Sequence, residues 1–158
     1  MYLLDTNSLS QILKGDPALD AWLDAKDDAA LATCVVVRGE LVYMAENSDR
    51  RAENLQDTEA LLAGLTIHDI DEATADAYGQ IKAAIFRCFG PKEKAKRRQT
   101  EWKTLGVDEN DVWIAAVAKQ RGLTVVSVDS DFQRIHQATG LPVENWLSPP
   151  TGQPTDES

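Results

Sequence analysis

Short apolar runs that end in polar, turn-prone residues recur along the chain, and segments of helical periodicity lie between most of them. The first run, residues 2–4, ends at Asp5, and apolar residues then recur at helical spacing as far as Gly15. Alternation of buried strands with helices is typical of an α/β domain built on a parallel sheet. We therefore expect one domain with a central parallel sheet of four to five strands flanked by helices. Further strands are predicted at residues 30–36, 65–70, 123–128 and 143–146.

Several helix boundaries carry recognisable cap chemistry. Asp16 precedes Pro17, and an aspartate followed by proline is typical of the cap and first position of a helix. Asp71 favours the start of a helix that runs to the break at Gly90-Pro91. Asp108 has the spacing of a cap for a helix that ends at Gly122, which places residue 111 in the first turn.

Four carboxylates from separate parts of the chain are predicted to meet at one edge of the sheet. Asp5 and Asp129 follow strands, whereas Glu40 and Asp111 fall in the first turns of helices. In open α/β sheets, ligands bind outside the carboxyl ends of the strands. Each acid alone is compatible with a cap, a turn or a solvated helix position. Together they indicate an oxygen-ligand site for Mg²⁺ or Mn²⁺, which suits hydrolysis of a phosphodiester.

The charge distribution is uneven. The chain has a net charge of −10, which by itself disfavours a nucleic-acid partner. Residues 87–103, however, hold seven Lys and Arg residues against two Glu residues, a local balance of +5. This basic segment is either a solvated charged loop, or a loosely held helix, or a surface for a phosphate backbone.

The remaining composition narrows the class of protein. Cys34 and Cys88 form no CxxC motif, and His68 and His136 are isolated, which disfavours a disulfide framework or a zinc site. We find no signal-peptide pattern and no apolar stretch of membrane-spanning length. We expect a soluble, cytoplasmic protein without a membrane partner.

Four motifs follow one another along the chain. They are Leu3-Leu4-Asp5-Thr6-Asn7, Val37-Arg38-Gly39-Glu40-Leu41-Val42-Tyr43, Asn110-Asp111-Val112-Trp113-Ile114-Ala115-Ala116, and the segment from Gly122 to Phe132. In this order they resemble the PIN-domain ribonucleases, and among them the VapC toxins of bacterial type II toxin–antitoxin systems. The closing strand around residues 143–146 is also similar to that family. The resemblance implies a PIN-like (Rossmann-like) fold and a Mg²⁺- or Mn²⁺-dependent endoribonuclease that cleaves RNA and so inhibits translation. It further implies neutralisation by a cognate antitoxin, and a homodimer.

The resemblance assigns roles to individual acids. Asp5, Glu40 and Asp111 match the metal-binding acids of the family, and Asp129 matches its more variable fourth acid. We expect Asp5 and Asp111 to hold the metal most directly, with Glu40 and Asp129 orienting or activating water. Asp131 competes with Asp129 for the fourth role. Supporting polar positions are Asn7 and Ser127.

The chain departs from the family pattern in two places. Cys34 and Val37 stand where a Ser or Thr often precedes the glutamate helix, which leaves the capping of that helix open. The basic stretch at about 88–105 is longer than usual and is predicted to be an insertion in a PIN domain spanning residues 1–147. We expect residues 148–158 to form a disordered tail. Candidate RNA-binding residues in the insertion are Lys94, Lys96, Arg97, Arg98 and Trp102.

Two other functions remain open on the sequence alone. A PIN-like module that binds RNA or protein without cleaving would keep the fold but not need the acids. A phosphohydrolase of the haloacid-dehalogenase type also begins with a strand that ends in aspartate. That chemistry needs a second aspartate two residues later, and this position is Asn7.

Overall fold

Five parallel strands form the central sheet in the computed structural model, which describes residues 1–26 and 30–148. Their spatial order is β3-β2-β1-β4-β5, and Leu4 of β1 is paired in register with Val126 of β4. The predicted α/β fold is therefore confirmed. Because the order changes direction between β1 and β4, the crevice outside their carboxyl ends is the expected ligand site. The strands are β1 (Tyr2–Leu4), β2 (Leu31–Cys34), β3 (Thr66–His68), β4 (Thr124–Val126) and β5 (Val143–Glu144).

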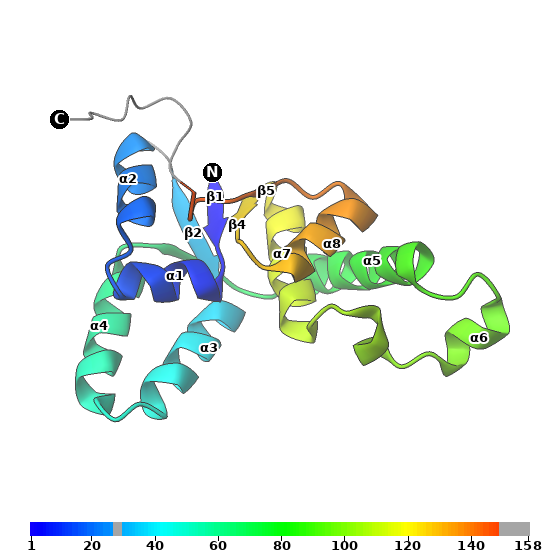
Figure 1. The fold of residues 1–158 in the computed structure, drawn as a ribbon, viewed down its shortest axis with the longest axis horizontal. Helices are drawn as coiled ribbons and strands as arrows, with labels where there is room; N and C mark the ends of the chain where they lie inside the picture. The colour runs from blue at the N-terminus through cyan, green and yellow to red at the C-terminus, as the bar shows by residue number, and fades with distance from the viewer. Residues whose placement is uncertain (27–29, 149–158) are drawn as a thin grey trace.

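The helices give the molecule two extended ends. Helices α3 and α4 form a hairpin at one end, and α5 and α6 extend toward the other (Figure 1). The first four are α1 (Thr6–Leu13), α2 (Pro17–Ala25), α3 (Val35–Glu46) and α4 (Arg51–Ala63). After them come α5 (Glu72–Phe89), α6 (Lys94–Gln99), the 3₁₀ helix η1 (Trp102–Leu105), α7 (Glu109–Arg121) and α8 (Ser130–Thr139).

Local cap chemistry positions the helices as the sequence predicts. The side chains of Asp16, Asp71 and Asp108 each accept a hydrogen bond from a backbone N–H in the first turn of the helix that follows. Gly122 ends α7 in the left-handed conformation, with φ of 66°, which glycine adopts without a steric penalty. The start of α7, which carries the predicted acid at position 111, is therefore fixed by its own sequence.

The strands after β1 are shorter than predicted. The strand expected at residues 30–36 ends at Cys34, since Val35 and Val36 already belong to α3. The strands expected at residues 65–70, 123–128 and 143–146 span residues 66–68, 124–126 and 143–144. Helix α8, which the sequence did not predict, begins directly after Asp129. The basic stretch at about 88–105 overlaps the end of α5, to which Cys88 belongs.

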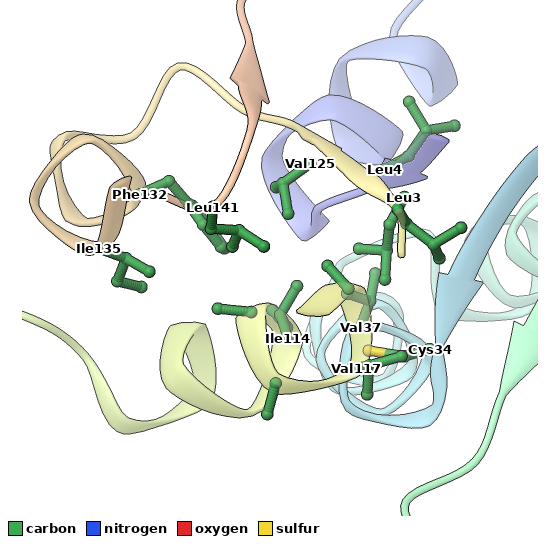
Figure 2. Packing of buried hydrophobic residues seen from close by; sticks show 14 of the residues in the cluster. Leu3, Leu4, Cys34, Val37, Ile114, Val117, Val125, Phe132, Ile135 and Leu141 are labelled. Carbon is green, nitrogen blue, oxygen red and sulfur yellow. The ribbon is translucent and has the colours of Figure 1, made fainter. Parts of the chain in front are cut away.

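The core surrounds α7 and the central strands. Val112 and residues 114–118 of α7 are at most 1% exposed, so this helix is buried on nearly all sides. Figure 2 shows Leu3, Ile114 and Phe132 among the side chains that gather between the strands and the helices. Full burial of each such side chain contributes about 1.5–3 kcal/mol. This packing holds α7 and α8 rigidly at the carboxyl edge of the sheet.

The end of the described chain is attached beside α2. Trp146 is 1% exposed and its ring stacks on Trp22, with centroids 5.5 Å apart. The indole N–H of Trp22 donates to the carbonyl of Ser148 at 2.6 Å. The remainder of the expected tail, residues 149–158, lies outside the described residues. Within residues 1–26 and 30–148, no helix combines the length and apolar content needed to cross a membrane.

Candidate metal centre and active site

A pocket of about 520 Å³ lies at the carboxyl edge of the sheet, between the starts of α1 and α7. It contains all four predicted acids, two further aspartates and one basic side chain, Lys14. An acidic lining of this kind attracts cations and basic side chains. The lining residues are Asp5, Thr6, Asn7, Ser10, Lys14, Glu40, Met44, Asp108, Asn110, Asp111, Asp129 and Asp131.

Asp5 is held in place by its own neighbours. It caps α1, is 3% exposed, and accepts a hydrogen bond from the backbone N–H of Ser8 at 2.7 Å. Burial raises the pKa of the Asp5 carboxyl, and hydrogen bonds from Ser127 and Ser8 oppose that rise. The Ser127 hydroxyl oxygen also accepts from the backbone N–H of Asp129 at 3.0 Å. Ser127 thus links the acids at the ends of β1 and β4.

Three aspartates crowd together on the other side of the pocket. Asp111, Asp129 and Asp131 each present a carboxylate oxygen within 4.8 Å of the other two. Burial, followed by the charges of Asp129 and Asp131, raises the pKa of Asp111 to about 8. Backbone N–H groups fix the arrangement of the three aspartates. Asp129 accepts a hydrogen bond from the backbone N–H of Asp131 at 2.9 Å. Asp131 in turn accepts from the N–H of Asp108 at 2.7 Å.

Glu40 connects the two sides of the pocket. It projects from α3 and accepts hydrogen bonds from the Thr6 hydroxyl and, at 2.8 Å, from the Asn110 side-chain amide. Neither partner was singled out by the sequence, although each lies next to a predicted acid in a motif. Helix α3 begins without a side-chain cap at Cys34, a question that the sequence left open. The position of Glu40 is therefore fixed by contacts with α1 and α7.

The donor set suits a hard divalent cation. Carboxylate oxygens are the ligands that Mg²⁺ and Mn²⁺ prefer, and the pocket has no Cys or His in its lining. Burial and then the neighbouring charges of Asp129 and Asp131 raise the pKa of Asp111, and a bound cation would offset both effects. The residues of the pocket therefore fit the expected metal.

The basic insertion lies apart from the pocket lining. Lys94, Lys96 and Arg98 are exposed on α6, and Arg97 is half-buried with a hydrogen bond to the carbonyl of Lys92 at 3.0 Å. No residue of α6 is among those that line the acidic pocket.

Trp102 is partly covered by its own chain. Its ring centroid lies 5.7 Å from that of Phe86, and the Lys82 ammonium lies 4.6 Å from the ring. Contacts within the protein thus already use part of the ring surface that a base would need for stacking.

Comparisons with known proteins agree with this geometry. The PIN domain model matches residues 2–137. Ribonuclease VapC2 of Haemophilus influenzae is 29% identical over 146 residues, covering 92% of this chain and 98% of that protein. The tRNA(fMet)-specific endonuclease VapC of Shigella flexneri is also 29% identical, over 92% and 97% of the two chains. The crystal structure of DNA-bound VapBC from Salmonella typhimurium matches with a TM-score of 0.71 and 25% identity, over 92% and 97% of the two chains. Fold, acidic pocket and sequence match together establish that the chain belongs to the PIN domain family.

Proposed function

We propose that this protein is a metal-dependent endoribonuclease of the VapC type, a toxin that cleaves RNA and is neutralised by a cognate antitoxin. The observation that carries the proposal is the acidic pocket at the carboxyl ends of β1 and β4. Two relatives are named ribonuclease or tRNA-specific endonuclease, and one structural neighbour is described as a member of the VapBC family of toxin–antitoxin systems. Membership in the PIN domain family removes support for the haloacid-dehalogenase alternative.

The residues of the pocket divide into two tasks. Asp5 and Asp111 hold Mg²⁺ or Mn²⁺ most directly, and Asp129 and Asp131 share the fourth position. When bound, the cation supplies charge stabilisation for the phosphodiester and lowers the pKa of water. Glu40 is oriented by Thr6 and Asn110, so its carboxylate is placed to accept a proton from the attacking water. Asn7, which lines the pocket, and Ser127, which bonds to Asp5, support these acids.

An apolar face next to the pocket supports the proposal that an antitoxin binds this protein. Leu13 and Met44 are 39% and 45% exposed, and both line a second cavity of about 280 Å³ between α1, α3 and α4. Met44 and Lys14 line both cavities, so a segment bound in the second cavity reaches the acidic pocket. We propose that the antitoxin covers this face and inserts a basic side chain among the acids. The expected homodimer is tested by light scattering of the antitoxin-free protein.

The basic insertion is proposed to bind the RNA backbone. Replacing Lys96, Arg97 and Arg98 by Gln is expected to weaken RNA binding and to flatten its salt dependence. With single-stranded RNA, the slope of log K against log salt becomes shallower by about 0.7 for each phosphate that the variant no longer neutralises. The control is Arg50→Gln/Arg51→Gln at the start of α4, a helix at the opposite end of the molecule from α6 (Figure 1). An unchanged slope in the insertion variant would refute this role.

The decisive test is cleavage of a mixed cellular RNA pool by purified, antitoxin-free protein. Parallel reactions contain Mg²⁺, Mn²⁺, or EDTA, and Asp111→Asn serves as the inactive control. We expect discrete fragments that disappear with EDTA and with the variant, and mapping their ends will identify the substrate. If folded protein binds Mn²⁺ but cleaves nothing, the chain is a binding module that has kept the PIN fold.

A further inference from the structure

Helix α8 holds the end of the insertion at two points that lie one helical turn apart. The Arg134 guanidinium donates from Nε and Nη2 to the carbonyl of Leu105, at 3.2 and 2.7 Å. One turn earlier, Asp131 accepts from the backbone N–H of Asp108 at 2.7 Å. Residues 131 and 134 share a helix face, and the backbone groups that they bind are also three residues apart. The two contacts therefore hold one short stretch of backbone, residues 105–108, against α8.

The contacts around Arg134 leave it little freedom. Its guanidinium carbon lies 4.0 Å from the ring centroid of Phe89 at the end of α5. Gly106 packs against the guanidinium of Arg134. Its φ is 71°, and a Cβ at this position would lie 3.4 Å from Nε of Arg134. Leu105 and Val107 are 3% and 4% exposed, so the held stretch is packed into the core. Hydrogen bonds from a charged donor such as a guanidinium are about twice as strong as hydrogen bonds between neutral groups.

The second contact uses an acid of the metal centre. Oδ2 of Asp131 accepts from the N–H of Asp108, which fixes the orientation of this carboxylate next to Asp111 and Asp129. Asp108 also caps α7 by accepting from the N–H of Asn110 at 2.8 Å. Since Asp111 lies in that first turn, the stretch 105–108 connects the position of Asp111 to that of Asp131.

We propose that Arg134 is a positioning residue for the metal centre, because it holds residues 105–108 against α8 and thereby sets the separation of Asp111 and Asp131. The inference rests on the proposed function only in taking these acids as metal ligands. It assigns Asp131 to the metal centre beside Asp129. Arg134 itself does not line the acidic pocket.

The test uses Arg134→Met, which keeps the length and the apolar contact with Phe89 but removes both donors. Mn²⁺ affinity is measured by calorimetry, and exchange of the Asp108 amide hydrogen by NMR. Loss of a group that orients metal ligands weakens metal binding by about 10- to 100-fold. We expect a loss in this range together with faster exchange at Asp108, and an intermediate result for Arg134→Lys. The matched control is Arg121→Met. Arg121 lies at the far end of α7, and its guanidinium donates to Asp71.

The two readouts separate the outcomes. Faster exchange at Asp108 with unchanged Mn²⁺ affinity, or no change in either quantity, would overturn the proposal. If Arg134→Met does not fold, Arg134→Gln and Arg134→Lys give the same comparison with one donor kept. If the wild-type protein binds no Mn²⁺, the proposed nuclease function fails and the positioning role fails with it. Absence of RNA cleavage alone leaves the Mn²⁺ comparison intact.

Discussion

The carboxylates on the two sides of the acidic pocket are stabilised in different ways. On the side of α1 and α3, Asp5 and Glu40 accept hydrogen bonds from Ser8, Thr6 and Asn110. On the side of α7 and α8, three aspartates lie within 4.8 Å of one another, and two of them accept bonds from backbone N–H groups close by. Donors from both α1 and α7 are thus directed at the acids of the first side, whereas the crowded charge of the second side calls for an external cation.

The pKa values of the buried Asp5 and the half-buried Asp111 express this difference. Burial raises the pKa of both, but hydrogen bonds from Ser127 and Ser8 counteract the rise at Asp5. At Asp111 every further influence, including the charges of Asp129 and Asp131, adds to the rise. Hydrogen-bond donors stabilise an ionised carboxylate in a fixed geometry, while like charges destabilise it until a cation binds. The α7–α8 side, together with Asp5, should therefore govern metal affinity, whereas Glu40 should govern the orientation of reacting groups.

The largest effect is expected for Asp111→Asn. Replacing a metal-holding carboxylate by an amide removes several kcal/mol of charge stabilisation, which lowers the cleavage rate by about 10³-fold or more. Single-turnover cleavage of an RNA fragment cut by the wild type measures this. Mn²⁺ affinity should fall with the rate. If the variant cleaves at more than a tenth of the wild-type rate, Asp111 is not part of the metal centre.

Stability should depend on pH through the same residue. The folded protein holds a proton on Asp111 up to about pH 8, whereas an unfolded aspartate releases it near 3.8. The metal-free protein therefore loses stability as pH rises from about 4 to about 8, by at most about 1.4 kcal/mol per pH unit. Thermal unfolding of wild type and Asp111→Asn measures this, and the variant should show a flatter profile. Added Mn²⁺ should stabilise the wild type more at pH 8 than at pH 5, and equal stabilisation would contradict the assignment.

Glu40→Gln separates the two sides more sharply. Loss of a proton acceptor lowers rates by about 10²- to 10⁴-fold, so cleavage should fall in this range. Mn²⁺ affinity should change much less than in Asp111→Asn, because Glu40 is not in the aspartate group of α7 and α8. Calorimetry and single-turnover cleavage on the same preparations provide both numbers. Equal losses of affinity in the two variants would assign Glu40 to the metal instead.

The smallest effect is expected for Thr6→Val. This change removes the hydroxyl that donates to Glu40, which keeps its bond from Asn110. A single hydrogen bond to a charged group contributes about 1.5–3 kcal/mol, so we expect a loss of rate of about 10- to 150-fold with unchanged Mn²⁺ affinity. Thr104→Val is the control, since its hydroxyl donates to the nearby carbonyl of Glu101. Identical rates for both variants would show that Thr6 does not orient Glu40.

Local signals explain why much of this arrangement was predictable. An aspartate that ends a strand and caps the next helix is visible in five consecutive residues, and the structure places Asp5 and Asp129 in this way. The parallel sheet then brings such positions to one edge. The length of β2 was misjudged because the β-branched Val35 and Val36 favour a strand, although both are half-buried in the first turn of α3.

Contacts between segments that are distant in the sequence could not be predicted from local patterns. The bonds from Thr6 and Asn110 to Glu40 span 34 and 70 residues, and the bond from Arg134 to Leu105 spans 29. Each depends on how three helices dock against the sheet, which no local pattern encodes. Helix α8 was missed for a related reason, since its first turn is the acidic turn itself.

The central place of β1 has a consequence for the nascent chain. Its neighbour β4 is formed by residues 124–126, and both Asp5 and Ser8 are bonded to the carbonyl of Val126. Domains fold during synthesis only as their segments emerge from the ribosome. A chain that has been translated as far as α6 holds Asp5 and Glu40 but neither Asp111 nor Asp129. The complete set of acids in the pocket therefore exists only after residues 108–131 have been synthesised, and shorter chains contain just the α1 and α3 side of it.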